Sequence, residues 1–313
     1  MKKALVSCPY AWESLSQEKE RFEKAGIALI RPEAVTQQLT EDELLRYAPE
    51  IAGILCGDDP VNDRVIQSAP KLRVIVKWGV GTDNIDIEAA KKRRIQVTNT
   101  PGLFSDDVAD VTIAYIVLLF RRLHQIDARV RSGDWHKPIG RSLQGRVLGI
   151  LGLGNIGRAV AQRAVAMKMV PIGYDPDSKA QEIAKTLGVE IVDPDVLLQK
   201  AEILTLHCSL TKQTRHFIDA RSLARCRKGA FLVNTSRGGL IEEKALIQAL
   251  GDGTLAAAAL DVFEAEPLAA SNALCAHSNV ILGSHNASHT LEAIQAVNKA
   301  AYELLLNGLS HAA

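Results

Sequence analysis

Short apolar runs alternate with segments of helical periodicity along most of the chain. Strands are predicted at residues 4–8, 27–30, 51–55, 73–76 and 95–98, with helical patterns such as 14–24 and 42–47 between them. The alternation resumes later, with strands predicted at 147–151, 170–175, 203–208, 230–234, 256–262 and 280–282. Buried strands separated by helices are typical of parallel sheets, so the pattern predicts an α/β fold with two sheet-centred parts.

Longer helices are predicted at residues 105–132, 180–187, 242–250 and 288–307. The first is expected to be one long helix that ends at Gly133, because glycine readily adopts the backbone angles that end helices. Its apolar stretch 111–120 is followed at once by Arg121 and Arg122 and is too short to cross a bilayer. We therefore interpret this stretch as part of a buried helix, in a protein that has no membrane partner.

Composition narrows the class of protein. The chain has 313 residues and a formal net charge of +1 at pH 7. This length exceeds what one small core usually serves, so we expect two domains. The near-neutral charge gives no electrostatic reason to expect a nucleic-acid partner. The five cysteines have no metal-like spacing, which favours reduced thiols in a cytoplasmic protein and no metal site.

A glycine-rich turn follows the predicted strand 147–151. Gly152, Gly154 and Gly157 form G-x-G-x-x-G where the strand pattern changes to a helix pattern. This spacing allows a tight turn, close approach of a pyrophosphate and close packing of helix on strand. Asp175 ends the next predicted strand, where a carboxylate accepts hydrogen bonds from ribose hydroxyls and repels an additional phosphate. The sequence therefore predicts a dinucleotide site for NAD, not NADP.

The loop 77–86, directly after a predicted buried strand, is a second candidate site. Gly79 and Gly81 expose backbone N–H groups that could hold a carboxylate, at the strand end where α/β sheets bind ligands. The alternative is an ordinary capped turn between a strand and a helix. The segment 99–102, Asn-Thr-Pro-Gly, is interpreted as a turn at a domain boundary.

Three polar side chains follow predicted strands in the second half of the chain. Because parallel strands end at the same edge of a sheet, we expect Arg237, Glu266 and His285 to converge. Arginine binds a carboxylate with two parallel hydrogen bonds and polarises a carbonyl. Histidine titrates near neutrality and suits proton transfer, while a neighbouring carboxylate orients it and favours its charged form. The set predicts hydride transfer between a nicotinamide and a 2-hydroxy or 2-oxo acid.

Taken together, these motifs resemble the NAD-dependent D-2-hydroxyacid dehydrogenase family, in its D-3-phosphoglycerate dehydrogenase-like branch. The matching segments are 79–86, 99–102, the glycine turn with Asp175, 207–211, 234–238, 261–267 and His285. The resemblance implies two doubly wound parallel-sheet domains with an active-site cleft between them. A flavodoxin-like substrate domain would contain residues 1–98 and 286–313, and a Rossmann NAD-binding domain would contain residues 99–285.

The resemblance also implies roles for individual residues. It makes His285, Glu266 and Arg237 catalytic, in the roles given above. The implied cofactor contacts are Val80, Gly152, Gly154, Asn155, Ile156, Gly157, Asp175, Cys208, Thr214, Thr235, Ser236 and Asp261. The implied substrate contacts are Lys77, Trp78, Gly79, Val80, Gly81, Arg237 and His285.

The implied reaction interconverts a D-2-hydroxy acid and its 2-oxo acid, with 3-phosphoglycerate and phosphohydroxypyruvate as the first expectation. Glyoxylate or hydroxypyruvate is the alternative, because the chain departs from the phosphoglycerate enzymes near the substrate. Phe104 stands where those enzymes often carry Asn, and Lys77-Trp78 replaces a common Arg. A remote alternative is an NAD(H)-dependent binding protein of the corepressor kind, which shares the fold.

Family members are commonly dimers through the NAD-binding domain, so a homodimer is expected. The loop after the helix at 105–132 carries Trp135, His136, Lys137 and Arg141. In related reductases a Trp in this loop reaches the active site of the partner subunit. We predict that this loop does the same and that its basic groups hold a substrate phosphate; the alternative is a plain dimer-surface loop.

Overall fold

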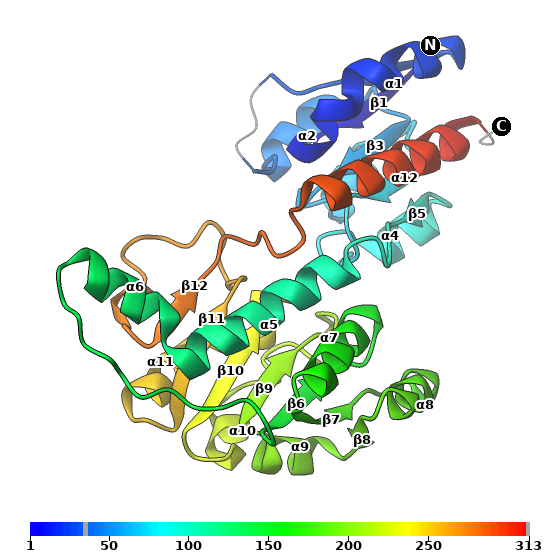
Figure 1. The fold of residues 1–313 in the computed structure, drawn as a ribbon. Helices are drawn as coiled ribbons and strands as arrows, with labels where there is room; N and C mark the ends of the chain where they lie inside the picture. Colours follow the sequence, from blue (N-terminus) through cyan, green and yellow to red (C-terminus); the bar gives the residue numbers. More distant parts are fainter. Residues whose placement is uncertain (34–36, 311–313) are drawn as a thin grey trace. The chain divides into compact units, whose positions relative to one another are not determined.

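The computed structural model describes residues 1–33 and 37–310. The chain forms two compact units (Figure 1): unit 1 contains Met1–Leu103 and His289–Ala313, and unit 2 contains Phe104–Ser288. The boundaries lie a few residues beyond the expected ones at 98 and 285. Within the described ranges, no helix combines the length and the apolar character needed to cross a membrane.

Unit 1 contains a five-stranded parallel sheet in the order β2-β1-β3-β4-β5. Its strands are β1 (Lys2–Val6), β2 (Ile27–Ile30), β3 (Gly53–Cys56), β4 (Val74–Lys77) and β5 (Gln96–Thr98). Its helices are α1 (Trp12–Lys24), α2 (Glu41–Tyr47), α3 (Asp63–Gln67), α4 (Ile87–Lys92) and α12 (Leu291–Ser310), with the 3-10 turn η1 (Pro9–Ala11). The alternation of apolar runs therefore located all five strands of this sheet.

Helix α12 returns the end of the chain to unit 1, where it lies against β3 and β4 (Figure 1). Its buried residues recur every three or four positions, as Val297, Ala301, Leu305 and Leu309 show. This spacing places them on one helix face, which covers the fully buried strands β3 and β4. Unit 1 is therefore assembled from segments near both ends of the sequence.

Unit 2 contains a seven-stranded parallel sheet in the order β12-β11-β10-β9-β6-β7-β8. Its strands are β6 (Val147–Leu151), β7 (Val170–Tyr174), β8 (Glu190–Ile191), β9 (Ile203–Leu206), β10 (Ala230–Asn234), β11 (Leu255–Leu260) and β12 (Val280–Leu282). Its helices are α5 (Ser105–Arg121), α6 (Leu123–Arg131), α7 (Asn155–Ala166), α8 (Ser178–Thr186), α9 (Pro194–Lys200), α10 (Ala220–Arg225) and α11 (Glu243–Gly251). Strand order reverses between β6 and β9, and such a switch point is where doubly wound sheets bind ligands.

The single helix predicted over residues 105–132 is wrong. The structure has two helices, α5 and α6, separated at Arg122, which adopts a left-handed backbone with φ of 54°. Apolar residues of α5 such as Ile116 and Phe120 are buried in unit 2, whereas α6 has no buried residue. Arginine is not a usual left-handed helix end, so the pattern gave no sign of this break.

Candidate active site

The glycine-rich turn joins β6 to α7 at the switch point of the unit 2 sheet. A Cβ placed on Gly157 would lie 2.0 Å from the carbonyl oxygen of Gly152, so only glycine fits there. A Cβ on Gly154 would meet nothing within 4 Å, and no side chain caps the first turn of α7. An open turn at an uncapped helix N-terminus suits a pyrophosphate.

Asp175 is fixed beside this turn. One carboxylate oxygen, Oδ2, accepts the N–H of Leu153 at 2.7 Å, and Oδ1 accepts the N–H of Asp177 at 2.9 Å. Arg158, which the sequence did not single out, donates to the Leu153 carbonyl and to Oδ1 of Asn155, both at 2.7 Å. The carboxylate and the turn are thus one hydrogen-bonded assembly that fits the ribose and pyrophosphate of NAD.

The end of β9 lines the same edge with uncharged groups. Burial lowers the pKa of His207 to about 3, and its Nε2 lies 2.9 Å from the Thr205 hydroxyl. Burial also raises the pKa of the Cys208 thiol to about 11. Both side chains are therefore neutral at physiological pH. Thr214, another expected cofactor contact, lies in the segment that follows β9, and its hydroxyl donates to the Ser209 carbonyl at 2.7 Å.

The turn that carries Arg237 follows β10 and is held by Asn234. The Asn234 side chain donates to the Arg237 carbonyl at 2.9 Å and accepts the N–H of Ser236 at 3.0 Å. Next to it, the buried Thr235 hydroxyl lies 2.9 Å from the hydroxyl of Thr112 in α5. Asn234 and Thr112 are supporting residues that the sequence analysis did not identify, because each acts only through a fold-dependent contact.

Glu266 and His285 form the central pair of this edge. Oε2 of Glu266 lies 2.7 Å from Nδ1 of His285, and Oε1 accepts the N–H of Phe263 at 2.8 Å. His285 has a left-handed backbone with φ of 57°, and its N–H donates to the Asp261 carbonyl at 2.7 Å. Such a conformation is unfavourable for a residue with a Cβ, and it is common at functional sites.

Asp261, an expected cofactor contact, holds the segment that follows His285. Its side chain is 1% exposed and accepts the N–H groups of Asn286 at 3.3 Å and Ala287 at 2.9 Å. The Tyr115 hydroxyl donates to the same carboxylate at 3.3 Å, and burial raises the pKa of Tyr115. The geometry thus gives Asp261 a supporting contact to the histidine segment; its contact to NAD stays a prediction.

The structure brings the three predicted catalytic residues to one edge of unit 2. Arg237, Glu266 and His285 follow β10, β11 and β12, which are neighbours in the sheet. A Cβ on Gly238 would lie 1.9 Å from the carbonyl carbon of Phe263, so the turns after β10 and β11 pack backbone against backbone. This edge combines a guanidinium, a carboxylate and an imidazole, as acid–base chemistry on a small acid requires.

The second candidate loop lies in unit 1, where Lys77, a predicted substrate contact, is held by neighbouring residues. The Lys77 side chain is only 2% exposed, and its Nζ donates to the Gly57 carbonyl at 2.5 Å and to Asp58 at 2.7 Å. Its ammonium is committed to these partners, because an ammonium buried in this way needs a nearby counter-charge. The placement therefore does not favour a direct substrate contact for Lys77.

Trp78 is buried in an aromatic cluster of unit 1. Its ring lies 5.3 Å from the ring of Tyr10 and 5.9 Å from that of His289. The indole Nε1–H donates to Oδ1 of Asn298 in α12 at 2.7 Å, and the amide of Asn298 donates to the Tyr10 carbonyl at 2.9 Å. One buried amide therefore links the segments after β1 and β4.

Only part of the glycine loop offers free N–H groups. The N–H of Gly79 donates to the Thr100 hydroxyl at 3.0 Å, so this amide is already engaged within the protein; a substrate contact of Gly79 stays a prediction. In the described parts of the chain, no protein hydrogen bond engages the N–H of Val80 or Gly81. Within residues 1–33 and 37–310, no three His, Cys, Asp or Glu side chains gather as metal ligands.

Comparison with known proteins agrees with this geometry. The model of the D-isomer specific 2-hydroxyacid dehydrogenase NAD binding domain matches residues 113–287. The chain belongs to this family. It is an NAD-dependent dehydrogenase, and its two parallel α/β sheets match the fold of solved family members.

Several relatives are similar over most of the chain. A glyoxylate reductase from Thermofilum pendens is 40% identical over 263 residues, which cover 82% of this chain and 78% of the relative. A D-3-phosphoglycerate dehydrogenase from Methanocaldococcus jannaschii is 42% identical over 84% of this chain, but only 50% of that relative is covered. The crystal structure of a D-lactate dehydrogenase from Aquifex aeolicus, complexed with NAD and lactic acid, matches with a TM-score of 0.85 and 25% identity, covering 96% of this chain and 93% of that one.

Proposed function

We propose that this dehydrogenase reduces a small unphosphorylated 2-oxo acid, glyoxylate or hydroxypyruvate, to the 2-hydroxy acid with NADH. The main observation in support of this reaction is the contact of 2.7 Å between His285 Nδ1 and Glu266 Oε2. The pair lies on the edge of the unit 2 sheet that also contains Arg237. An imidazole held by a carboxylate, on the same sheet edge as a guanidinium, suits protonation of a carbonyl oxygen.

The catalytic roles follow from the contacts. When bound at the glycine turn, NADH would supply the hydride that reduces C2 of the 2-oxo acid. Arg237 binds the substrate carboxylate and polarises the carbonyl. His285 donates the proton to the carbonyl oxygen from Nε2, since Nδ1 is engaged by Glu266. Glu266 holds the ring and stabilises its charged form before transfer.

Two observations support an unphosphorylated substrate over the first expectation, phosphohydroxypyruvate. A phosphate needs a nearby cation. The lysine of the glycine loop, Lys77, is buried and paired with Asp58, which leaves the predicted phosphate contact to the basic loop residues Lys137 and Arg141. The Thermofilum relative, covered over 78% of its length, is named a glyoxylate reductase. Phosphohydroxypyruvate remains the second candidate, because the 42% identical relative from Methanocaldococcus is named a D-3-phosphoglycerate dehydrogenase.

The test is NADH oxidation with equal concentrations of glyoxylate, hydroxypyruvate and phosphohydroxypyruvate, repeated with NADPH. We expect turnover of the first two with NADH. His285→Ala should lower kcat by about 100-fold or more, whereas the control His277→Ala, at the turn after Ala273–Ala276, should leave it unchanged. A preference for the phosphorylated acid overturns the substrate assignment. NADH binding without turnover of any 2-oxo acid would favour the corepressor-like alternative.

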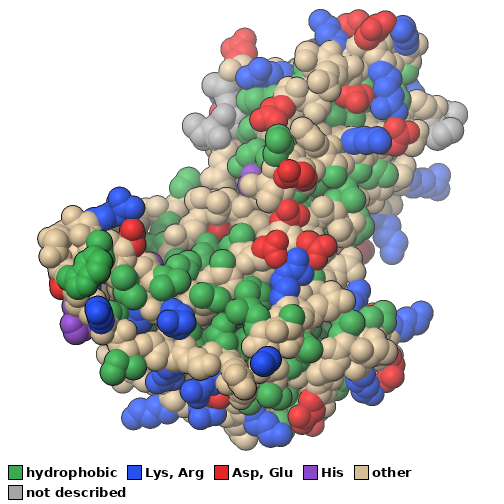
Figure 2. Space-filling view, in the orientation of Figure 1, with side chains coloured by type: hydrophobic (Ala, Val, Ile, Leu, Met, Phe, Trp, Pro, Cys, Tyr) green, Lys and Arg blue, Asp and Glu red, His purple; other side chains and the backbone are tan. Residues whose placement is uncertain are grey.

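We also propose that the chain forms a homodimer through the arm made by α6 and residues 132–142. Figure 2 shows apolar side chains gathered over this arm, at the left of the view. Trp135 is 76% exposed and Ile139 is 92% exposed, so burial against a second copy is favourable. The Arg141 guanidinium lies 5.5 Å from the Phe231 ring, near the amino end of β10, so it is directed away from the catalytic edge of its own unit 2.

A further inference from the structure

The segments after β4 and β5 run side by side in unit 1. Val76 of β4 pairs with Thr98 of β5, so the glycine loop leaves one strand where residues 99–100 leave the next. Residues 99–102 were interpreted from the sequence as a boundary turn. The structure gives the first two of these residues direct contacts to the glycine loop.

Asn99 and Thr100 clasp the glycine loop through three groups of its backbone. The Thr100 hydroxyl accepts the Gly79 N–H at 3.0 Å, and the Thr100 N–H donates to the Gly79 carbonyl at 2.9 Å. The Asn99 side-chain amide donates to the Val80 carbonyl at 2.7 Å. Thr100 is 2% exposed, so these hydrogen bonds are shielded from competing water.

The far end of the loop is held independently. The Asn84 amide donates to the carbonyls of Gly57 at 3.0 Å and Asp59 at 2.7 Å. The buried Asp59 carboxylate in turn accepts the N–H of Gly57 and the hydroxyl of Ser7, both at 2.8 Å. Val80 and Gly81 therefore lie between two fixed points.

These hydrogen bonds from Asn99 and Thr100, here called the clasp, determine which backbone N–H groups of the glycine loop face a ligand. Gly79 has φ of +121°, a conformation that L side chains rarely adopt, and its N–H and C=O are both used by Thr100. The N–H groups of Val80 and Gly81 make no hydrogen bond within the described residues. Successive backbone N–H groups of this kind form an anion-binding concavity.

We propose that Asn99 and Thr100 are positioning residues that direct the Val80 and Gly81 amides at the carboxylate of the 2-oxo acid. Loss of the Thr100 hydroxyl releases the Gly79 N–H, so the turn can rotate and the two amides lose their common direction. The carboxylate then binds more weakly, while Arg237, Glu266 and His285 keep their own contacts. This inference rests on the proposed function.

The test compares Thr100→Val with Thr98→Val. Both remove a threonine hydroxyl at nearly the same site, but the Thr98 hydroxyl is buried without a hydrogen-bond partner among the described residues. We expect Thr100→Val to raise the KM for glyoxylate and the inhibition constant of oxamate about 5- to 10-fold, as loss of one hydrogen bond does. The KM for NADH and kcat should change less than about 2-fold, a split that general destabilisation does not produce.

Thr100→Ser keeps the hydroxyl and should restore the wild-type KM, and Thr98→Val should behave as wild type. An unchanged KM in Thr100→Val, or an equal rise in Thr98→Val, overturns the inference. If Thr100→Val does not fold, Asn99→Ala tests the second arm of the clasp by the same KM split. If the wild type turns over no 2-oxo acid, the proposed function fails. In that case the effect of Asn99 and Thr100 is tested by binding alone: oxamate is titrated into the protein with NADH present, and tryptophan fluorescence reports the binding.

Discussion

Oε2 of Glu266 holds Nδ1 of His285 at 2.7 Å, while the other oxygen of the same carboxylate accepts a backbone N–H of its own loop at 2.8 Å. The carboxylate therefore cannot follow the imidazole if the ring turns, and the ring is fixed relative to the sheet. Because the backbone of His285 is also left-handed, two independent constraints determine where its Nε2 points.

The first prediction concerns the charge of this carboxylate. Glu266→Gln keeps an oxygen acceptor but removes the charge that favours the protonated imidazole, so kcat for reduction should fall by about 100-fold. The pH above which reduction is lost should also move down, because the variant releases the proton of His285 more readily. A pH profile of kcat from pH 5 to 9 measures both effects.

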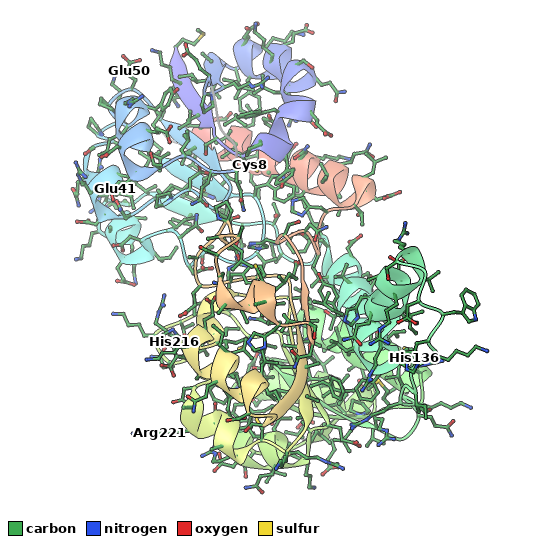
Figure 3. All side chains as sticks on the ribbon, turned by 90° about the vertical axis from the view of Figure 1, so that its left-hand side faces the viewer. Cys8, Glu41, Glu50, His136, His216 and Arg221 are labelled. Atoms are coloured by element: carbon green, nitrogen blue, oxygen red, sulfur yellow. The ribbon has the colours of Figure 1, made fainter. Side chains whose placement is uncertain are left out.

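Glu264→Gln is the matched control for this change. Glu264 lies on the same loop, two residues before Glu266, but pairs with the surface residue His216, labelled in Figure 3. We expect its pH profile to follow that of the wild type. Equal losses in the two variants would mean that the loop needs both charges for its conformation, and that Glu266 has no special role.

The second prediction separates packing from cofactor binding in the glycine turn. Gly157→Ala forces a Cβ against the Gly152 carbonyl, so it should lower the free energy of unfolding by about 1–3 kcal/mol. Gly154→Ala meets no protein atom, so Tm should stay unchanged while the Kd for NADH rises. Thermal melts and NADH titrations of both variants check this. An unchanged Kd in Gly154→Ala would contradict the assignment of this turn to NAD.

The third prediction concerns acid stability. The ordinary pKa of histidine is 6.5, whereas burial lowers that of His207 to about 3 in the folded chain. Between these values the unfolded chain binds a proton that the folded chain does not, so stability falls as pH drops below 6.5, by at most about 1.4 kcal/mol per pH unit. His207→Gln removes this contribution. Urea unfolding at pH 7 and pH 5 should show a smaller loss for His207→Gln than for the wild type or for His277→Gln.

The fourth prediction tests the proposed dimer. Replacing Trp135 by Ala and Ile139 by Asp removes the two most exposed apolar groups of the arm. We expect light scattering to give the mass of two 33.9 kDa chains for the wild type and of one for the double variant. Ile183→Asp, an exposed apolar position in α8, is the control and should stay dimeric. A wild type that elutes as a single chain at micromolar concentration would contradict the proposal.

The sequence predicted most strands of the two sheets because these strands are compact apolar runs. Ile27–Ile30, Ala230–Asn234 and Val280–Leu282 lie where the pattern placed them. Short or irregular elements were missed, since two residues of strand at Glu190–Ile191, or a helix broken at Arg122, leave no periodicity to detect.

The placement of the three predicted catalytic residues on one sheet edge was predictable for a related reason. Arg237, Glu266 and His285 each follow a strand, and parallel strands share an edge. Their supports were not predictable, because Asn234 and Asp261 act through bonds that exist only once the turns are folded. The burial of Lys77 was not predictable for the same reason. Its partner Asp58 is 19 residues distant in sequence, and a position at the end of a strand does not determine the direction of a side chain.

The hydrogen bond between Trp78 and Asn298 joins residues 220 positions apart in the sequence. It can form only after α12 has been synthesised, so unit 1 is completed late. Unit 2 is continuous from residue 104 to 288, so its domain can fold while the chain is still being extended. Unit 1 contains residues 1–103 but also needs α12, which is translated only after unit 2. The apolar surfaces of β3 and β4 therefore stay uncovered until α12 has been synthesised. A stop codon that removes α12 should yield a chain that aggregates or is degraded.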